Sequence, residues 1–206
     1  MTDSTSSSIE ELRAVVGEPT AGLELKIYDE LFDEACEFIA RSPFLVLSTS
    51  DRAGNHDASP KGDAPGFVVV EDSKTLLIPD RPGNRLVYGH TNILEQPHVG
   101  ILFVIPGTTE TLRVNGRASL HTGVELLDRL GARDRPAVLA IRVEVDQCFF
   151  HCSKAFIRSA LWKAETWPEP RKLSFGAMFA RRLGTEDPGV VRTIDDAIAE
   201  DYRTNL

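Results

Sequence analysis

The sequence predicts a mainly β, α+β fold built on an antiparallel sheet that is closed or split as a barrel. Strand-like segments follow one another through the middle of the chain, and most are joined by short turn signals. Few helix-like segments lie between them. A doubly wound sheet needs a long crossover between its parallel strands, so the pattern favours the antiparallel barrel.

The chain of 206 residues is long enough for one compact domain with added segments. We expect an N-terminal extension over residues 1–28, a barrel domain over residues 29–167 and a C-terminal extension over residues 168–206. The C-terminal extension contains large apolar residues, among them Phe175 and Phe179. Because apolar patches mark interfaces, it is expected to pack on the barrel or on a second subunit.

Helical patterns precede the strands. Ile9 to Val16 is expected to form a short helix, closed by Gly17 and Pro19. Asp29 to Arg41 carries apolar residues at helical spacing and predicts an amphipathic helix that ends before Pro43.

Apolar, β-branched segments bounded by turn residues predict the strands and the helices between them. The expected strands cover Phe44–Thr49, His56–Ser59, Phe67–Val70, Thr75–Ile78, Val99–Ile105, Glu110–Leu120 and Ala137–Val145. The expected later helices cover Leu86–Leu94, Glu125–Leu130 and Lys154–Lys163.

The strand Glu110–Leu120 separates polar from apolar side chains. With a period of two, one face carries Thr111, Arg113, Asn115, Arg117 and Ser119, and the other face suits a core. Two guanidinium groups and an amide in a row would suit an anionic ligand. The alternative is a solvated polar face, which antiparallel sheets commonly have.

Two further clusters are rich in cations and glycine. Ser59-Pro60-Lys61-Gly62-Asp63 places a hydroxyl and an ammonium beside a glycine that allows close backbone approach. Asp80-Arg81-Pro82-Gly83-Asn84-Arg85 follows an apolar strand and opens an expected helix. Such a junction presents backbone amides to an anion, and Arg85 adds a charged donor.

We expect these clusters to form one anion site, because they concentrate cations on a chain of net charge −8. The alternative for each cluster is an ordinary turn with salt bridges. Neither cluster is a nucleotide-binding P-loop or a dinucleotide fingerprint. Hydrolase chemistry lacks support, because Ser59 has no nucleophile-elbow context.

The composition limits the partners and the compartment. A net charge of −8 argues against a general affinity for nucleic acid or anionic membranes. No apolar run reaches the roughly 18 residues of a membrane span. The three cysteines form no dense framework, which favours reduced thiols in a cytoplasmic protein.

The segment Cys148 to Cys152 is expected not to bind a metal. If it is a strand, Cys148 and Cys152 lie roughly 13 Å apart, at about 3.3 Å per residue, which is too far to share an ion. In a helix they would reach one ion, but His151 brings the ligand count only to three.

The clusters, in this order, resemble the FMN-binding split-barrel proteins related to pyridoxamine 5'-phosphate oxidase. The blocks that carry the resemblance are Ser59–Asp63, Ile78–Asn84, Glu110–Gly116 and Phe150–Trp162. The similarity runs from about Asp29 to Trp167. It implies a six-stranded antiparallel split barrel, a homodimer, and one FMN in each of two grooves at the interface.

The resemblance also implies roles for particular residues. Lys61, Asn84 and Arg85 would hold the phosphate and ribityl chain, with Ser59, Gly62, Asp63, Asp80 and Arg81 in the same two blocks. Arg113 and Asn115 would lie near the flavin, from the same or the partner subunit, and Lys154 and Arg158 would complete the site. Many relatives have Arg where this chain has Lys61, so a bidentate phosphate contact becomes a point-charge contact.

The implied function is an FMN-dependent oxidoreductase with a small-molecule electron donor or acceptor. The C-terminal arginine and histidine signature of true pyridoxamine phosphate oxidases is not recognisable, so oxidation of pyridoxine phosphate is not expected. The cofactor carries the redox chemistry in such proteins, so no side chain is assigned as catalytic. The alternatives are a non-catalytic flavin-binding or flavin-sensing protein, or a split barrel that uses a deazaflavin or haem.

Overall fold

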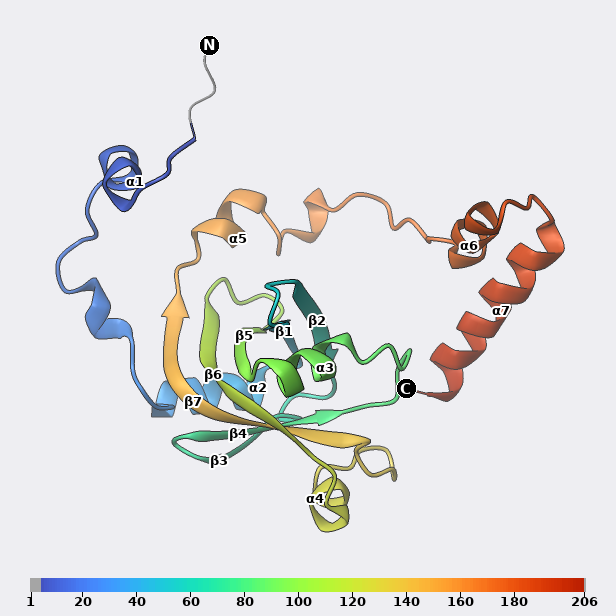
Figure 1. The fold of residues 1–206 in the computed structure, drawn as a ribbon, viewed down its shortest axis with the longest axis horizontal. Coiled ribbons are helices and arrows are strands. Elements are labelled where there is room, and N and C mark those ends of the chain that lie inside the picture. Colours follow the sequence, from blue (N-terminus) through green and yellow to red (C-terminus); the bar gives the residue numbers. More distant parts are fainter. Residues whose placement is uncertain (1–4, 206) are drawn as a thin grey trace.

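The computed structural model describes residues 5–205, and Figure 1 shows their arrangement. The first four residues of the expected N-terminal extension and Leu206 lie outside the described residues. The described chain forms one antiparallel sheet of seven strands in the order β2-β1-β5-β6-β7-β4-β3. The strands are β1 Phe44–Ser50, β2 His56–Gly62, β3 Val69–Asp72, β4 Thr75–Asp80, β5 His98–Val104, β6 Thr111–His121 and β7 Leu139–His151.

The sheet confirms the antiparallel α+β prediction, with a different number of strands. Every segment expected as a strand contains one, although β3 and β7 each begin two residues later than predicted, so the described residues contain seven strands and not six. The strand β3 is short, pairs with β4 and forms one edge of the sheet. No ladder joins β2 to β3 within residues 5–205, so backbone hydrogen bonds do not close the sheet.

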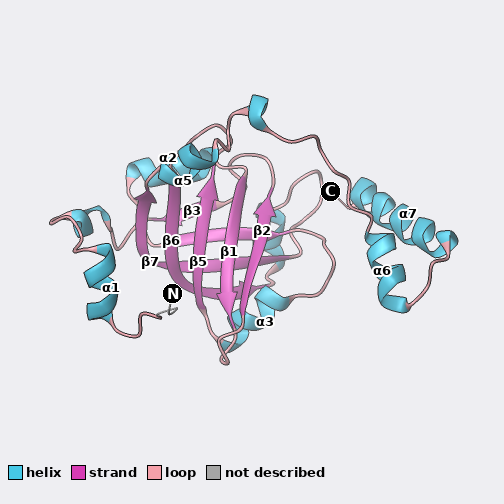
Figure 2. Cartoon of the chain, turned by 90° about the horizontal axis from the view of Figure 1, so that it is seen from above, coloured by secondary structure: helices cyan, strands magenta, loops and turns pink. Residues whose placement is uncertain are grey.

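The two longest strands, β6 and β7, connect two layers. The first half of β6 pairs with β5, whereas the first half of β7 pairs with β4. A bulge between Asn115 and Gly116 bends the β6–β7 ribbon. Figure 2 shows the consequence, because β1, β5 and β6 cross in front of strands that run in another direction.

The apolar core lies between these layers. Leu45 and Phe103 enter it from β1 and β5, and Ile78 and Ile141 enter it from β4 and β7; all four are fully buried. On β6 the predicted apolar face is in the core, whereas Arg113, Arg117 and Ser119 are exposed. Thr111, the first residue of the strand, was predicted on the polar face but is buried.

Three short helices pack against strands of the sheet. Helix α2, Asp33–Arg41, buries Ala35 and Ile39 and begins four residues later than predicted. Helix α3, Tyr88–Glu95, buries Ile93 and packs on β1, β2 and β6. The short α4 is Val124–Arg129.

The segments outside the sheet are helical. Before α2, the chain forms α1, Ile9–Val16, and a 3₁₀ turn, η1, Leu23–Lys26. After β7 come α5, Lys154–Ser159, and a 3₁₀ turn, η2, Ala164–Thr166. Helix α5 is shorter than predicted because Ala160 adopts a left-handed conformation with φ of 51° and ends it.

Two further helices, α6 Phe175–Leu183 and α7 Pro188–Thr204, form a hairpin at the C-terminal end. Figures 1 and 2 both show this hairpin standing beside the sheet, on the side opposite α1. Among the described helices, none combines the length and the apolar character that crossing a bilayer requires.

Candidate functional site

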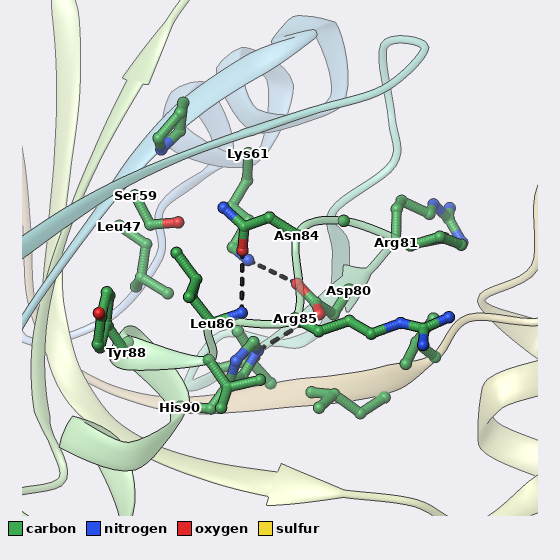
Figure 3. Close-up of a pocket in the computed structure, with 18 of the residues that line it drawn as sticks. Leu47, Ser59, Lys61, Asp80, Arg81, Asn84, Arg85, Leu86, Tyr88 and His90 are labelled. Carbon is green, nitrogen blue, oxygen red and sulfur yellow. Dashed lines mark hydrogen bonds and ion pairs between the residues drawn. The ribbon is translucent and has the colours of Figure 1, made fainter. Parts of the chain in front are cut away.

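A cavity of about 630 Å³ lies between β2, the end of β4, the loop that follows β4 and the start of α3 (Figure 3). This volume is in the range of small-molecule sites. The structure brings most residues of the two predicted clusters to its wall. They are Ser59, Lys61, Gly62, Asp80, Arg81, Asn84 and Arg85.

Lys61 and Asp80 form the central ion pair of the cavity. The Lys61 ammonium lies 2.5 Å from Oδ1 of Asp80, and both side chains are largely buried. Burial acts to raise the pKa of Asp80, but the neighbouring His90 and the Lys61 ammonium outweigh it and lower the pKa. The carboxylate therefore stays ionised at neutral pH, and part of the Lys61 charge is neutralised.

His90 lies on the other side of the same carboxylate. Its Nε2 is 3.4 Å from Oδ2 of Asp80, but the approach lacks the alignment of a hydrogen bond. Nδ1 and Nε2 of His90 are the buried side-chain polar atoms that lack a hydrogen-bond partner among residues 5–205. Since buried polar atoms are normally paired, the unpaired imidazole in the cavity wall indicates room for a polar ligand.

Arg81 is directed away from the ion pair, as Figure 3 shows. Its Nε lies 2.8 Å from Oδ2 of Asp63, and one terminal nitrogen donates to the Leu130 carbonyl at 2.8 Å. Arg133 contacts the other Asp63 oxygen at 3.1 Å. Burial acts to raise the pKa of Asp63, but the Ala64 N–H and the two arginines lower it overall. Arg81 and Asp63 therefore fix the loop and lend little charge to the cavity.

Lys61 and Arg81, two cations of the cavity wall, are paired with carboxylates. Arg85, the third, forms no ion pair with a carboxylate of residues 5–205. It sits in a loop held by Asn84, whose side-chain oxygen accepts from the Leu86 N–H at 3.0 Å. Arg85 and Val87 have φ of 61° and 51°, the left-handed region that a β-branched residue such as Val87 rarely adopts. Strained backbone of this kind clusters at ligand-binding loops.

The rest of the cavity wall is mainly apolar. It is formed by Leu47, Leu86, Val87, Tyr88, Val138, Leu139 and Ile141. The cavity therefore combines the side chains of Lys61 and Arg85 with a mainly apolar wall.

The structure places four predicted site residues elsewhere in the chain. Arg113 lies over the ring of Phe149, 5.9 Å from its centroid, and Asn115 donates to Gln147 at 3.2 Å. Lys154 and Arg158 are exposed on α5. None of the four lines the 630 Å³ cavity of the same chain.

The segment around Cys148 is a strand, which is the first of the two conformations considered for it, strand and helix. Cys148 is fully buried, and burial, with a smaller effect of Cys36, raises its pKa to about 12. Cys152 lies just beyond β7 and is exposed. Partial burial, then Arg113 and Lys26, lower the pKa of His151. Within residues 5–205, no three His, Cys, Asp or Glu side chains form a metal-binding group, and the expected lack of zinc stays a prediction.

Sequence reasoning missed His90 as a member of the site. Its spacing from other histidines carries no signal, because its neighbours Asp80 and Lys61 come from β4 and β2. Its place one turn into a helix that follows the cationic loop is the signal that would have found it.

Comparisons with known proteins point to one family. Residues 31–152 match the family model described as Pyridoxamine 5'-phosphate oxidase. No curated protein sequence matches the chain. All residues that line the cavity lie within the matched segment.

Three solved structures that are similar to the chain are between 13% and 18% identical to it. HupZ from Group A Streptococcus is 18% identical, with a TM-score of 0.47, and the match covers 58% of this chain and 93% of that one. General stress protein 26 from Bacillus anthracis is 17% identical, with a TM-score of 0.44 and coverage of 62% and 94%. An FMN-binding protein from Syntrophomonas wolfei is 13% identical, with a TM-score of 0.42 and coverage of 56% and 87%.

Proposed function

The chain belongs to the pyridoxamine 5'-phosphate oxidase family, and from this premise we propose that it is an FMN-dependent oxidoreductase on a split β-barrel. The observation that carries the proposal is the meeting of Lys61 and Arg85 in one cavity of about 630 Å³. The two residues come from separate sequence blocks, on β2 and on the loop after β4.

The cationic side chains of the cavity suit the phosphate and ribityl chain of FMN. Arg85 would donate charge-assisted hydrogen bonds to the phosphate, and Lys61 would add a second positive charge. Asn84 and Ser59 offer further polar groups at the wall. Asp80 keeps Lys61 oriented, and the Asp63–Arg81 pair holds the base of the loop.

The apolar part of the cavity suits the flavin ring. Leu86 and Tyr88 come from the loop after β4 and the start of α3, and Val138 and Leu139 come from the chain at the start of β7. The unpaired nitrogens of His90 would have a partner in a polar atom of the ligand. When bound, the flavin supplies the electron transfer; these residues bind it, orient it and exclude water.

A homodimer would bring the remaining predicted residues to the site. Arg113, Asn115, Lys154 and Arg158 do not reach the cavity of their own chain, and a two-fold partner would present them to it. Leu86 and Tyr88 at the cavity mouth are exposed, which supports a partner surface there.

The substrate is proposed to be a small molecule other than pyridoxine phosphate, because the arginine and histidine signature of the true oxidases is absent from residues 1–206. The electron donor would be reduced nicotinamide or another soluble carrier. A binding or sensing protein on the same fold would show the same cavity but no turnover.

The absorbance spectrum of the purified protein tests the cofactor. FMN gives bands in the blue and near-ultraviolet, a deazaflavin gives a shifted pattern, and haem gives a Soret band. Oxidation of reduced nicotinamide by the FMN-loaded protein then separates an enzyme from a binder. A haem spectrum, or no uptake of added FMN, would contradict the proposal.

A further inference from the structure

The imidazole of His90 lies in the wall of the 630 Å³ cavity with both of its nitrogens unsatisfied. Nδ1 and Nε2 are shielded from solvent, and neither forms a hydrogen bond with another group of residues 5–205. The side chain as a whole is 15% exposed. Because buried polar atoms are normally paired, His90 is placed to contact a ligand in the cavity.

The Asp80 carboxylate connects His90 to Lys61. Its Oδ2 lies 3.4 Å from Nε2 of His90, and its Oδ1 contacts the Lys61 ammonium. Figure 3 shows both approaches as dashed lines that meet at the carboxylate. Since Asp80 is ionised at neutral pH, it favours a proton on Nε2, the nitrogen that faces it. Nδ1 is then the nitrogen left for a ligand.

The state of Nδ1 decides which ligand atoms His90 accepts. In a neutral imidazole with its proton on Nε2, Nδ1 carries a lone pair and is an acceptor. The oxygens of a phosphate dianion are acceptors too, so the two atoms would repel each other. In the imidazolium both nitrogens are donors, one toward Asp80 and one toward the phosphate. A phosphate beside His90 therefore requires the charged form.

The charges around the cavity leave room for one more cation. The Lys61 ammonium is paired with Asp80 and so lends little net charge to a ligand. A second carboxylate, Asp57, lines the same cavity as Arg85. It lies beside the start of α3, because a Cβ on Gly89 would be 3.2 Å from its Oδ2. A phosphate monoester carries a charge of about −1.5 to −2 at pH 7, and its binding favours a further positive charge in the wall.

The groups that can act on the charge of His90 come from several elements. The titratable side chains that line the cavity with it are Asp57, Lys61, Asp80, Arg81, Arg85 and Tyr88. Helix α3 also packs on β1 and β6. Strand β1 has no titratable side chain. Those of β6 contact other groups: Arg113 the ring of Phe149, Arg117 the ring of His98, and His121 the hydroxyl of Ser119.

We propose that His90 binds the phosphate of the flavin nucleotide as an imidazolium, so that binding takes up a proton from solution. Nε2–H is directed to Asp80, and the proton that is taken up resides on Nδ1, which donates to a phosphate oxygen. No covalent bond of the ligand changes. The inference rests on the proposed function and adds a pH dependence to it. The site should bind FMN more tightly as the pH falls through the range in which imidazoles titrate.

Calorimetric titration of the apo-protein with FMN tests the proton uptake. Measurements at about pH 7, in buffers of different ionisation enthalpy, give the number of protons taken up per FMN bound. The wild type should take up more protons than His90→Gln, by up to about one per FMN. His98→Gln is the matched control, because the exposed His98 contacts Gln96 and does not line the cavity. It should take up as many protons as the wild type.

Riboflavin separates the phosphate from the rest of the ligand. It has the ring and the ribityl chain of FMN but lacks the phosphate. Its binding should show the same proton uptake in the wild type and in His90→Gln. A His90-dependent uptake as large as that seen with FMN would overturn the assignment of His90 to the phosphate.

The pH dependence of the FMN dissociation constant gives a second readout. Linkage changes the affinity about tenfold per pH unit for each proton taken up. Between about pH 6.5 and pH 8 the wild-type affinity should therefore fall more steeply than that of His90→Gln. A merely structural role of His90 would instead lower the affinity of the variant by one factor at every pH.

Two kinds of failure are distinguishable. Equal proton uptake by the wild type and His90→Gln, or parallel pH profiles, would overturn the role of His90 and leave FMN binding, and with it the proposed function, in place. No binding of FMN by the wild type at any pH would overturn both.

Discussion

The Lys61 ammonium lies 2.5 Å from Oδ1 of Asp80 and so joins β2 to β4, two strands that share no ladder. In the sheet order, β1, β5, β6 and β7 separate them. A side-chain ion pair therefore spans the side of the sheet that backbone hydrogen bonds leave open. The same pair lines the 630 Å³ cavity, which links the architecture of the sheet to the candidate site.

Breaking this pair should cost stability. Asp80→Asn leaves the Lys61 ammonium, 17% exposed, without its partner, and we expect the free energy of unfolding to fall by about 3 kcal/mol. Urea unfolding measures the change. Asp29→Asn is the matched control, because the Asp29–Lys74 pair is largely exposed, and its loss should cost less than about 1 kcal/mol.

The dependence of stability on acid pH should show the contribution of the Lys61–Asp80 pair. The folded protein lowers the pKa of Asp80, so this carboxylate stabilises the fold above its unfolded pKa of about 4, and the contribution is lost as pH falls through the lower folded pKa. The free energy of unfolding of Asp80→Asn should therefore fall less steeply below about pH 4 than that of the wild type. Parallel pH profiles of the two proteins would contradict the assignment.

The left-handed Val87 should be a site of strain. Val87→Gly removes the β-branched side chain at φ of 51°, and we expect a gain of about 0.5–1 kcal/mol after the entropic cost of glycine. Val87→Ala keeps the Cβ and should gain less. Thermal unfolding checks both variants, and a Tm lowered by Val87→Gly would show that the loop is not strained there.

The bulge between β6 and β7 should tolerate no side chain at Gly116. A Cβ there would lie 2.1 Å from the Glu144 carbonyl oxygen, so Gly116→Ala should destabilise the protein by about 2 kcal/mol or more. At Gly123 the same addition meets nothing within 4 Å, and Gly123→Ala should be nearly neutral. Equal stabilities of the two variants in urea would argue against the bulge.

Much of the fold could be predicted from local pattern. The alternation along β6 and the apolar runs of β1, β4 and β5 gave strands at the expected places. The local sequence pattern did not predict that β2 continues to Gly62 and β7 to His151, because pairing with β1 and β6 sets those ends. The end of α5 at Ala160 depends on a single backbone conformation.

The candidate site was partly predictable. The cations and glycines of two blocks indicated an anion site, and the fold brings Lys61 and Arg85 to one cavity. The neutralising partners Asp80 for Lys61 and Asp63 for Arg81 depend on which strands become neighbours, which the sequence does not state. Whether Arg113 reaches the cavity depends on a second subunit and stays a prediction.

Two of the free thiols, Cys148 and Cys152, should differ in reactivity. Cys152 is exposed and should react with a thiol reagent in the native protein. Cys148 is buried, and its pKa of about 12 disfavours the thiolate, so it should react only after unfolding. Mass spectrometry of the labelled peptides, with and without denaturant, shows which cysteine reacts first. Rapid native labelling of Cys148 would contradict its place in the core.

Titration of the apo-protein with FMN tests the central claim most directly. We expect one FMN per chain, and Arg85→Ala and Lys61→Ala should each weaken binding by about 1.5–3 kcal/mol, the scale of a hydrogen bond to a charged group. Arg192→Ala, on the exposed face of α7, should bind as the wild type does. Affinity unchanged in both cavity variants, or no FMN binding by the wild type, would contradict the account.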